Sequence, residues 1–401
     1  MKKLFRYLHL NELGFPEMFC ALSMLLSGYR VGGVPLQYLV PLLIVIMVIG
    51  RTKSIRINSK PILFFFVFYL IHTFVWPFYM ASIPKNFFNV SFANIIILAV
   101  LILVGGNLNY RKLIGSINWV AIISMVGMVY HYLLMLRGQS FTPIPLPFLS
   151  NSMDEGLAQR LDLIRPTSFF PEPAAYVAFM IIPLFVALLE QKFLYAVAII
   201  LTIFMSSSTT GLLGVFLMAA VYVFTEKTRA WTKITLIGLS GVLVAVLLTT
   251  SFFEQSIDKI NNTDLETSVR MAQGPYVVST MEPSEFILGV PYGDAYDYCM
   301  HSGRAGEVEV YGESVYMPTL WNILLVWGVV GLVFYVYIMW YYYRRNKELA
   351  PFVVFFYATM VSSSYMIGIT FCFYMLFIMS YDRSQRLLYG KDDGSKVFMS
   401  R

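Results

Sequence analysis

Long runs of apolar residues, separated by short polar segments, make up most of the chain between residues 15 and 380. Several runs approach or reach the roughly 20 residues with which an α-helix crosses a hydrocarbon core about 30 Å thick. The alternation of apolar and polar positions that marks membrane-embedded strands is absent from these runs. Because a backbone inside lipid must satisfy its own hydrogen bonds, the pattern predicts an all-α polytopic integral membrane protein.

The apolar runs predict about twelve membrane-spanning helices. Several runs are shorter than 20 residues, which indicates tilted or partly inserted helices. The last run is interpreted as two short passes that turn near residues 362–364, because a single helix there would place the basic C-terminal tail on the other side. The predicted spans are 15–30, 34–50, 61–80, 91–106, 115–136, 173–189, 193–206, 211–224, 234–251, 319–340 and the two passes within 351–380.

Composition agrees with a single transmembrane domain over residues 1–401. Hydrophobic residues make up 58% of the chain and charged residues 13%, whereas about a quarter of a soluble domain is charged. The basic start MKKLFRYLHL precedes an apolar run without a small-residue cleavage site, so we expect a retained first helix. The three cysteines, Cys20, Cys299 and Cys372, indicate no disulfide framework.

Lysine and arginine residues lie mainly on alternate connections of the predicted helices. With both termini placed in the cytoplasm, the inside segments hold 21 of the 29 Lys and Arg residues and the outside segments hold eight. This bias follows the positive-inside rule. The net charge of +6 is therefore explained by orientation, and no nucleic-acid partner is expected. Membrane lipids are the expected surroundings.

Two outer connections are long, at residues 137–172 and 252–318, whereas all inside connections are short. The predicted spans hold few ionisable groups, of which Glu17, His72 and His131 are the clear ones. We expect these three to be satisfied packing residues, since an ion-driven transporter usually carries midplane carboxylates or broken helices in matching halves. Chemistry is therefore expected at the outer surface.

The first outer loop ends in an arginine and a carboxylate before an apolar helix, in the segment LIRPTSFFPEPAAYVAF of residues 163–179. In one interpretation Pro171–Pro173 is an ordinary helix start, with Glu172 favoured by the helix dipole and Arg165 paired with Glu172 or lipid headgroups. In the other, Arg165 and Glu172 belong to a site, together with Arg160 of the same loop.

The second outer loop holds the one histidine that we place in aqueous reach on the outer face, His301, followed by Arg304. A histidine can accept a proton near neutral pH, although a surface-loop histidine explains the residue equally well. Arg270 precedes both in the chain. No His, Cys, Asp or Glu cluster has metal-ligand spacing, so we expect a metal-independent protein without a cofactor.

These motifs together resemble the Wzy-type polymerases of O-antigen and capsular polysaccharide and the related O-antigen ligases. The resemblance spans roughly residues 90 to 340, and the order of the short motifs and the topology carry it. The motifs are Arg165-Pro-Thr-Ser-Phe-Phe-Pro-Glu172-Pro-Ala, Ser268-Val-Arg270, the turn from Gly289 to Gly293, the His301 segment, Trp327-Gly328-Val-Val-Gly331 and the Ser/Thr-rich turn near residue 210.

The resemblance implies a glycosyltransferase of GT-C-like architecture in the bacterial inner membrane, with periplasmic or extracellular outer loops. A polymerase of this family joins oligosaccharide repeat units carried on undecaprenyl pyrophosphate, and a chain-length regulator is a candidate partner. The leaving group is an anionic pyrophosphate, which arginine binds well because its planar guanidinium holds phosphate with two hydrogen bonds. The candidate phosphate ligands are Arg165, Arg270, Arg160 and Arg304.

An acceptor hydroxyl must also lose a proton, for which His301 is the first candidate and Glu172 the second. Two other functions stay open. An O-antigen ligase would transfer the finished chain to lipid A core, and a transporter or flippase would move lipid-linked oligosaccharide without joining it. The form Phe-Phe-Pro-Glu-Pro at residues 169–173 favours the polymerase.

Overall fold

The computed structural model describes residues 2–51, 59–75, 85–139, 142–151, 165–225, 238, 269–290, 295–304, 317–362 and 368–389. This part of the chain is predominantly helical and contains fifteen α-helices. The N-terminal half of the bundle contains α1 (Lys2–Tyr7), α2 (Phe15–Leu25), α3 (Leu36–Arg51), α4 (Lys60–Val75), α5 (Lys85–Val104) and α6 (Tyr110–Leu136).

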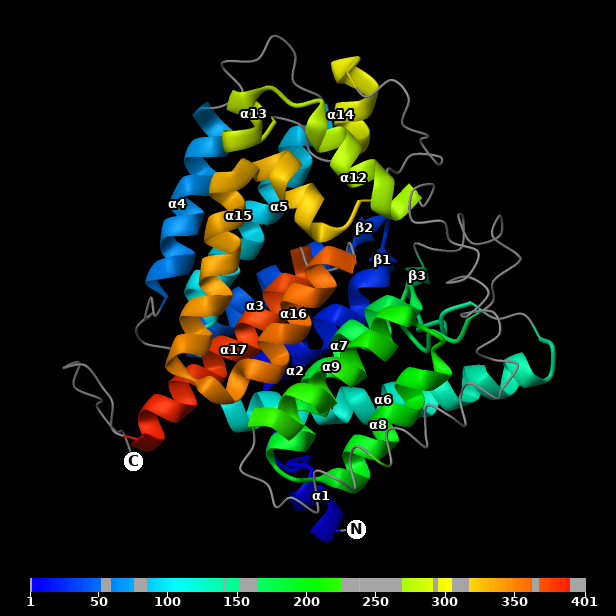
Figure 1. Cartoon of the computed structure of the whole chain (residues 1–401). Coiled ribbons are helices and arrows are strands. Elements are labelled where there is room, and N and C mark those ends of the chain that lie inside the picture. The colour runs from blue at the N-terminus through cyan, green and yellow to red at the C-terminus, as the bar shows by residue number, and fades with distance from the viewer. Residues whose placement is uncertain are drawn as a thin grey trace.

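The remaining long helices are α7 (Pro173–Leu189), α8 (Phe193–Met205), α9 (Thr209–Thr225), α15 (Thr319–Arg345), α16 (Ala350–Ser362) and α17 (Gly368–Tyr389). Three shorter helices, α12 (Val269–Ser279), α13 (Pro283–Leu288) and α14 (Ala295–Ser302), come from the predicted second outer loop. They lie together at the top of the molecule in Figure 1, whereas α1 and the end of α17 lie toward the bottom and lower left.

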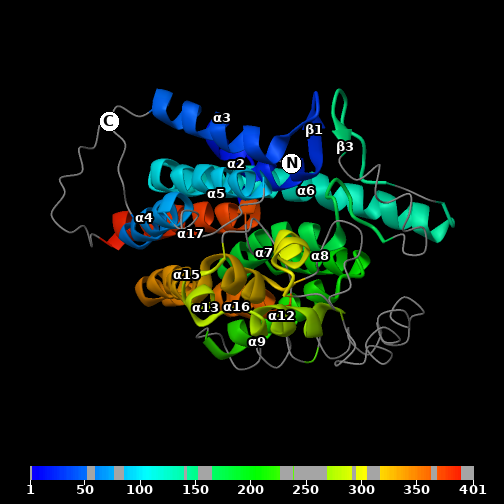
Figure 2. The same cartoon turned by 90° about the horizontal axis from the view of Figure 1, so that it is seen from above.

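A small antiparallel sheet connects the start of the chain to the first outer loop. Its strands are β1 (Tyr29–Val31), β2 (Val34–Pro35) and β3 (Ser150–Asn151), in the order β2-β1-β3. Arg30 pairs with Pro35 on one side and with Ser150 on the other. Figure 2 shows β1 and β3 side by side.

Most predicted spans are helices in the structure. The span 173–189 coincides with α7, and the run 351–380 forms two helices, α16 and α17, rather than one. In contrast, α6 begins five residues before the predicted span, at Tyr110, because the side chain of Asn109 accepts a hydrogen bond from the Lys112 N–H and caps the helix there. The predicted span 234–251 lies outside the described residues apart from residue 238.

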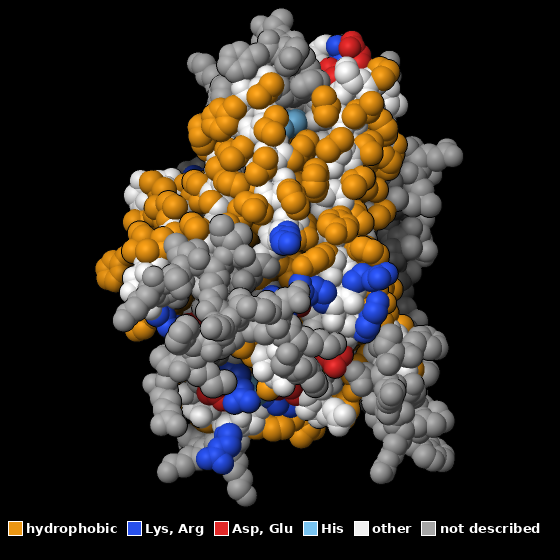
Figure 3. All heavy atoms as spheres, turned by 90° about the vertical axis from the view of Figure 1, so that its left-hand side faces the viewer, with side chains coloured by type: hydrophobic (Ala, Val, Ile, Leu, Met, Phe, Trp, Pro, Cys, Tyr) orange, Lys and Arg blue, Asp and Glu red, His pale blue; other side chains and the backbone are white. Residues whose placement is uncertain are grey.

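Two of the described helices, α6 and α15, are long and apolar enough to cross a membrane by length and composition, and seven further apolar helices are shorter. Figure 3 shows the face of the molecule that includes α4, which apolar side chains cover over most of its upper part. Most of the Lys and Arg side chains visible there lie in the lower half of this face. The described part of the chain is thus an all-α bundle with the character of a membrane protein.

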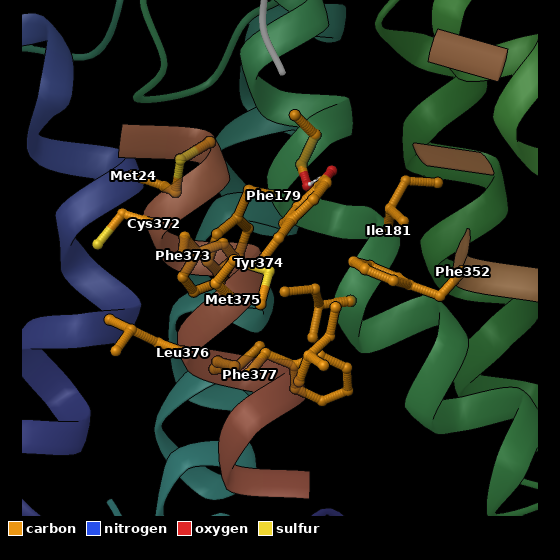
Figure 4. Close-up of a cluster of buried hydrophobic side chains, with 14 of the residues drawn as sticks. Met24, Phe179, Ile181, Phe352, Cys372, Phe373, Tyr374, Met375, Leu376 and Phe377 are labelled. Carbon is orange, nitrogen blue, oxygen red and sulfur yellow. Dashed lines mark hydrogen bonds between the residues drawn. The ribbon is translucent and has the colours of Figure 1, made fainter. Parts of the chain in front are cut away.

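Helices α7 and α17 form the centre of the bundle, because each is buried on every side. All residues from Ala175 to Leu188 of α7 are buried, and so are all residues from Thr370 to Asp382 of α17. A helix that is apolar all round belongs inside a large core. Figure 4 shows the two helices in contact through Phe179 and Phe373, whose rings stack at 5.4 Å.

A hydrogen bond also joins the two central helices. The hydroxyl of Tyr374 donates to the carbonyl oxygen of Ala178 over 2.7 Å, drawn as a dashed line in Figure 4. At the other end of α17, the buried carboxylate of Asp382 forms ion pairs with Arg345 at 3.2 Å and with Arg386 at 2.8 Å. It also accepts a hydrogen bond from the side-chain amide of Asn346 at 2.8 Å. These contacts fix α17 against α7 at one level and against α15 at another.

The packing around α17 predicts a large difference between two Phe→Ala substitutions. Phe377 is fully buried against Phe185 and Phe352, whereas the side chain of Phe64 on α4 is 61% exposed. Phe377→Ala should lower the free energy of unfolding by about 3 kcal/mol because it leaves a cavity, and Phe64→Ala should change it by less than about 0.5 kcal/mol. Unfolding followed in detergent measures both. Equal losses would mean that α17 is not a core helix.

Candidate functional site

The first group of predicted site residues lies at the start of α7. Pro173 is the first residue of this helix and Glu172 is its N-cap, with an extended backbone at φ −146°. The carbonyl oxygen of Glu172 accepts hydrogen bonds from the N–H groups of Ala175 and Tyr176. The carboxylate makes no capping hydrogen bond and is half-buried. The helix start therefore explains the backbone of Glu172 and both neighbouring prolines, but not its carboxylate.

The residues just before the N-cap are held by a polar clamp on α6. The Nδ1 atom of His131 accepts hydrogen bonds from the N–H of Ser168, at 3.1 Å, and from the N–H of Thr167, at 3.4 Å. The hydroxyl of Ser168 donates to the carbonyl oxygen of Ser124 at 2.8 Å. All four residues are buried, so these hydrogen bonds are shielded from water. We call Ser124, His131, Thr167 and Ser168 the loop clamp.

The loop clamp holds a strained backbone. Ser168 has a φ of +58°, in the left-handed region that few residues other than glycine adopt. Such a conformation costs of order 1–3 kcal/mol and persists only where the surrounding structure determines it. Phe170 helps to hold Ser168 in this conformation through apolar contacts. Its side chain is fully buried, and its ring centroid lies 5.5–5.6 Å from those of Tyr176 and Phe179.

A second layer of hydrogen bonds ties the clamp to the other part of the first outer loop. The carbonyl oxygen of Ser168 accepts from the N–H of Ile144 at 3.0 Å, and the carbonyl oxygen of Ile144 accepts from the hydroxyl of Tyr29 at 2.6 Å. Arg165 lies at the entrance of this segment and is half-buried. Arg165 and Glu172 thus stand at the two ends of an eight-residue segment whose middle is fixed.

The second group of predicted site residues lies on α12, α13 and α14. Arg270 belongs to α12 and His301 to α14, and their side chains are outside the described part of the structure. The guanidinium of Arg304 forms ion pairs with Glu285 at 2.6 Å and with Glu282 at 3.0 Å. These carboxylates also form the capping box that begins α13. Arg304 therefore ties the end of α14 to the start of α13.

A small hydrophobic core of its own stabilises this unit of three short helices against α15. Burial raises the pKa of the Tyr298 phenol, which stays neutral and shares a hydrogen bond of 2.9 Å with the hydroxyl of Thr280. The buried members of this core are Val277, Val278, Val290, Tyr298, Cys299, Met317, Leu324 and Leu325. The unit that carries Arg270, His301 and Arg304 is accordingly a packed element.

Two glycine motifs that are about 40 residues apart in the sequence meet where this unit joins α15. Gly289 and Gly328 both have a positive φ with ψ near 180°, a conformation open essentially to glycine alone. A Cβ on Gly328 would lie 2.3 Å from the carbonyl oxygen of Ile287, and a Cβ on Gly289 would lie 2.3 Å from that of Val326. We call this crossing the glycine lock.

One hydrogen bond supports the glycine lock, and a buried histidine lies next to it. The N–H of Val290 donates to the carbonyl oxygen of Leu325 at 2.8 Å, where the helical pattern of α15 is interrupted. The buried ring of His72 on α4 lies next to the backbone of Leu288. His72 was expected to be a packing residue, and in the structure it is buried beside the segment that crosses α15.

The other predicted features have local explanations. In the Ser/Thr-rich turn, the hydroxyl of Ser206 donates to the carbonyl oxygen of Ile203 at 2.6 Å, and that of Ser208 accepts from the N–H of Gly211 at 3.4 Å. The turn therefore closes on itself. Arg160 lies outside the described residues. Among the described residues, no group of three or more His, Cys, Asp and Glu could hold a metal ion.

Comparison with known proteins adds no relative from which a role could be transferred. No protein-family model, curated protein or solved structure matches the chain. The chemistry must therefore be argued from the residues of the chain and their geometry. That geometry gives two groups: Arg165 and Glu172 around the loop clamp, and Arg270, His301 and Arg304 on the unit fixed by the glycine lock.

Removing the acceptor of the loop clamp should release the segment before α7. His131→Leu leaves two buried N–H groups without a partner, at about 1–3 kcal/mol each. Hydrogen–deuterium exchange of the amides of Thr167 and Ser168 should then become faster. His131→Asn is the matched control, because its Oδ1 atom can take the place of Nδ1 and should preserve most of the protection. Unchanged exchange in His131→Leu would show that the clamp does not hold the loop.

The glycine lock predicts that two Gly→Ala substitutions differ sharply. Gly328→Ala places a methyl group against backbone atoms at 2.3–2.5 Å, so α15 and the end of α13 must separate. Gly303 also has a positive φ, but nothing lies within 4 Å of its Cβ position, and Gly303→Ala should cost only the left-handed preference of about 1–2 kcal/mol. Thermal unfolding in detergent compares the stability of the two variants. If Gly328→Ala lowers the stability no more than Gly303→Ala does, the glycine lock is contradicted.

Proposed function

We propose that the chain is a membrane glycosyltransferase that polymerises undecaprenyl-pyrophosphate-linked oligosaccharide repeat units into O-antigen or capsular polysaccharide. The observation that carries this proposal is the loop clamp. A strained serine, Ser168, is held by buried hydrogen bonds midway between a half-buried arginine and a half-buried carboxylate. Such strain is typical of sites that hold reacting groups in place, and an ordinary helix start does not require it.

The reaction needs cations at the leaving group and a base at the acceptor. As the glycosidic bond to the carrier breaks, negative charge builds on the pyrophosphate oxygen, and a fixed guanidinium stabilises it. Arg165 is placed for this role in the proposal, with Arg270, Arg160 and Arg304 as further phosphate ligands. Arg304 would have to share its guanidinium with Glu282 and Glu285.

The acceptor hydroxyl attacks the anomeric carbon and loses its proton to His301 or to Glu172. The structure favours Glu172 as a candidate proton acceptor, because its carboxylate makes no capping hydrogen bond at the helix it begins. In contrast, the side chain of His301 lies outside the described part of the structure. The proposal needs no metal, since the arginines supply the positive charge.

The proposal places the chain in the bacterial inner membrane with about twelve spans in a GT-C-like arrangement and with both termini in the cytoplasm. Three observations support this orientation. The apolar face in Figure 3 is bordered by Lys and Arg side chains in its lower half. α1 and the end of α17 lie toward the bottom and lower left of Figure 1, and α12, α13 and α14 lie at the top. A chain-length regulator remains a candidate partner.

A transporter of lipid-linked oligosaccharide fits the buried ionisable groups less well than an enzyme does. Glu17 binds Arg51 at 3.2 Å and accepts from the N–H of Asn109 at 3.0 Å. His131 accepts hydrogen bonds from loop backbone, and His72 is buried next to the backbone of Leu288. Each of these groups has a structural partner, which leaves none of the three as an obvious carrier of a coupling ion. An O-antigen ligase would use the same outer site and is separated from a polymerase by experiment.

Deleting the gene and running the surface polysaccharide on a gel tests the proposal. A polymerase deletion should leave lipid core capped with a single repeat unit, because ligation continues without polymerisation. Accumulation of long carrier-linked chains would indicate a ligase, and accumulation of single units on the cytoplasmic side would indicate a flippase. An unchanged polysaccharide ladder would contradict all three functions.

Complementing the deletion tests the role of Arg165. Arg165→Ala should abolish the long-chain ladder, and Arg165→Lys should restore it only in part, because an ammonium group cannot bind phosphate with two parallel hydrogen bonds. Arg137→Ala is the matched control, since Arg137 is exposed at the end of α6 on the same loop. Immunoblots should show equal amounts of each variant in the membrane. A full ladder with Arg165→Ala would exclude stabilisation of the leaving group by this residue.

A further inference from the structure

Helix α13 has a charged side and an apolar side. Glu285 is buried and paired with Arg304, and both lie with Glu282 on the charged side. On the other side Phe286 is 40% exposed and Ile287 is 51% exposed. Two adjacent large apolar side chains are thus exposed on a short helix at the outer end of the bundle. Contact of such side chains with water is unfavourable, which indicates a surface that contacts another apolar phase or molecule.

The apolar side of α13 continues the exposed face of α4. Near the end of α4, Ile71, Phe74 and Val75 are all exposed. His72, in the middle of this set, lies next to the backbone of Leu288, the last residue of α13. Figure 1 shows α13 beside the upper end of α4, and in Figure 3 apolar side chains extend over this face toward its top.

The position of α13 is fixed, so its apolar side is a permanent surface. The glycine lock crosses α15 directly after Leu288, and Val290 is buried in the small core beneath the unit. Short amphipathic helices with apolar side chains on one side and charges on the other commonly lie in the interface between lipid and water.

We propose that α13 is an interfacial anchor, whose Phe286 and Ile287 side chains insert among the lipid acyl chains of the outer leaflet beside α4. This inference rests on the membrane placement in the proposed function and deepens it. Because α13 joins α12 to α14, the anchor sets the height of Arg270, His301 and Arg304 above the lipid. A lipid-linked pyrophosphate lies at that height, directly above the acyl chains.

Spin labels on single cysteines measure where α13 lies. The native cysteines Cys20, Cys299 and Cys372 are buried thiols, so they are first replaced, and polymer formation is checked in that background. Labels at positions 286 and 287 are then compared in lipid vesicles for collision with oxygen, which concentrates in lipid, and with a water-soluble nickel chelate. The ratio of oxygen to nickel collisions should be higher at 286 and 287 than at Ser279, an exposed residue at the end of α12.

A label at Ile71 on α4 separates the two levels of the inference. Oxygen-rich collisions at positions 71, 286 and 287 support the anchor. If the label at 71 collides mainly with oxygen while those at 286 and 287 collide mainly with the nickel chelate, the anchor is overturned and the membrane placement stays intact. If the labels at all three positions collide mainly with the nickel chelate, the membrane placement itself is overturned. Labels at 286 and 287 that are immobile and shielded from both reagents would mean that protein covers α13, which also contradicts the proposal.

Discussion

The complete burial of α7 and α17 is the constraint on which the rest of the structure depends. A helix without a solvent-facing side must be surrounded by other helices, and every polar group near it needs an internal partner. Tyr374 meets this requirement by donating to the carbonyl oxygen of Ala178, and Asp382 meets it with two arginines and an asparagine. Since α7 begins directly after the predicted first outer loop, the residues before its N-cap are attached to a helix whose position is fixed.

The same requirement turns isolated polar side chains into connections between distant segments. Glu17 joins the start of α2 to the end of α3 and to the residue that caps α6. His131 holds a loop 36 residues further along the chain, and His72 is buried beside the end of α13. Removing one partner from such a buried pair leaves the other unsatisfied, which costs more than the bond contributed. We therefore expect these residues to resist substitution for structural reasons alone.

Sequence patterns predicted the helices much better than they predicted the contacts. Long apolar runs fix where helices form, so α7 and the separate helices α16 and α17 agree with the prediction. The start of α6 was predicted five residues late because the charged residues there, Arg111 and Lys112, hide the cap at Asn109. The left-handed backbone of Ser168 and the meeting of Gly289 with Gly328 depend on tertiary contacts, which no local pattern carries. The site residues could be named from motifs, but not how they are held.

Within the described residues, the two groups of candidate residues are held by separate sets of contacts, and the bundle core connects them. The loop clamp fixes Arg165 and Glu172 to α6 and α7, whereas the glycine lock fixes the unit with Arg270 and Arg304 to α15. Helices α16 and α17 both pack against α7 and against α15. A shift of α16 or α17 would move one group relative to the other, while the loop clamp and the glycine lock themselves stayed unchanged. A displacement of about 1 Å can cost a reaction about two orders of magnitude in rate. In the proposed reaction, the aromatic packing around α17 would therefore matter alongside the arginines, because it sets the distance between the two groups.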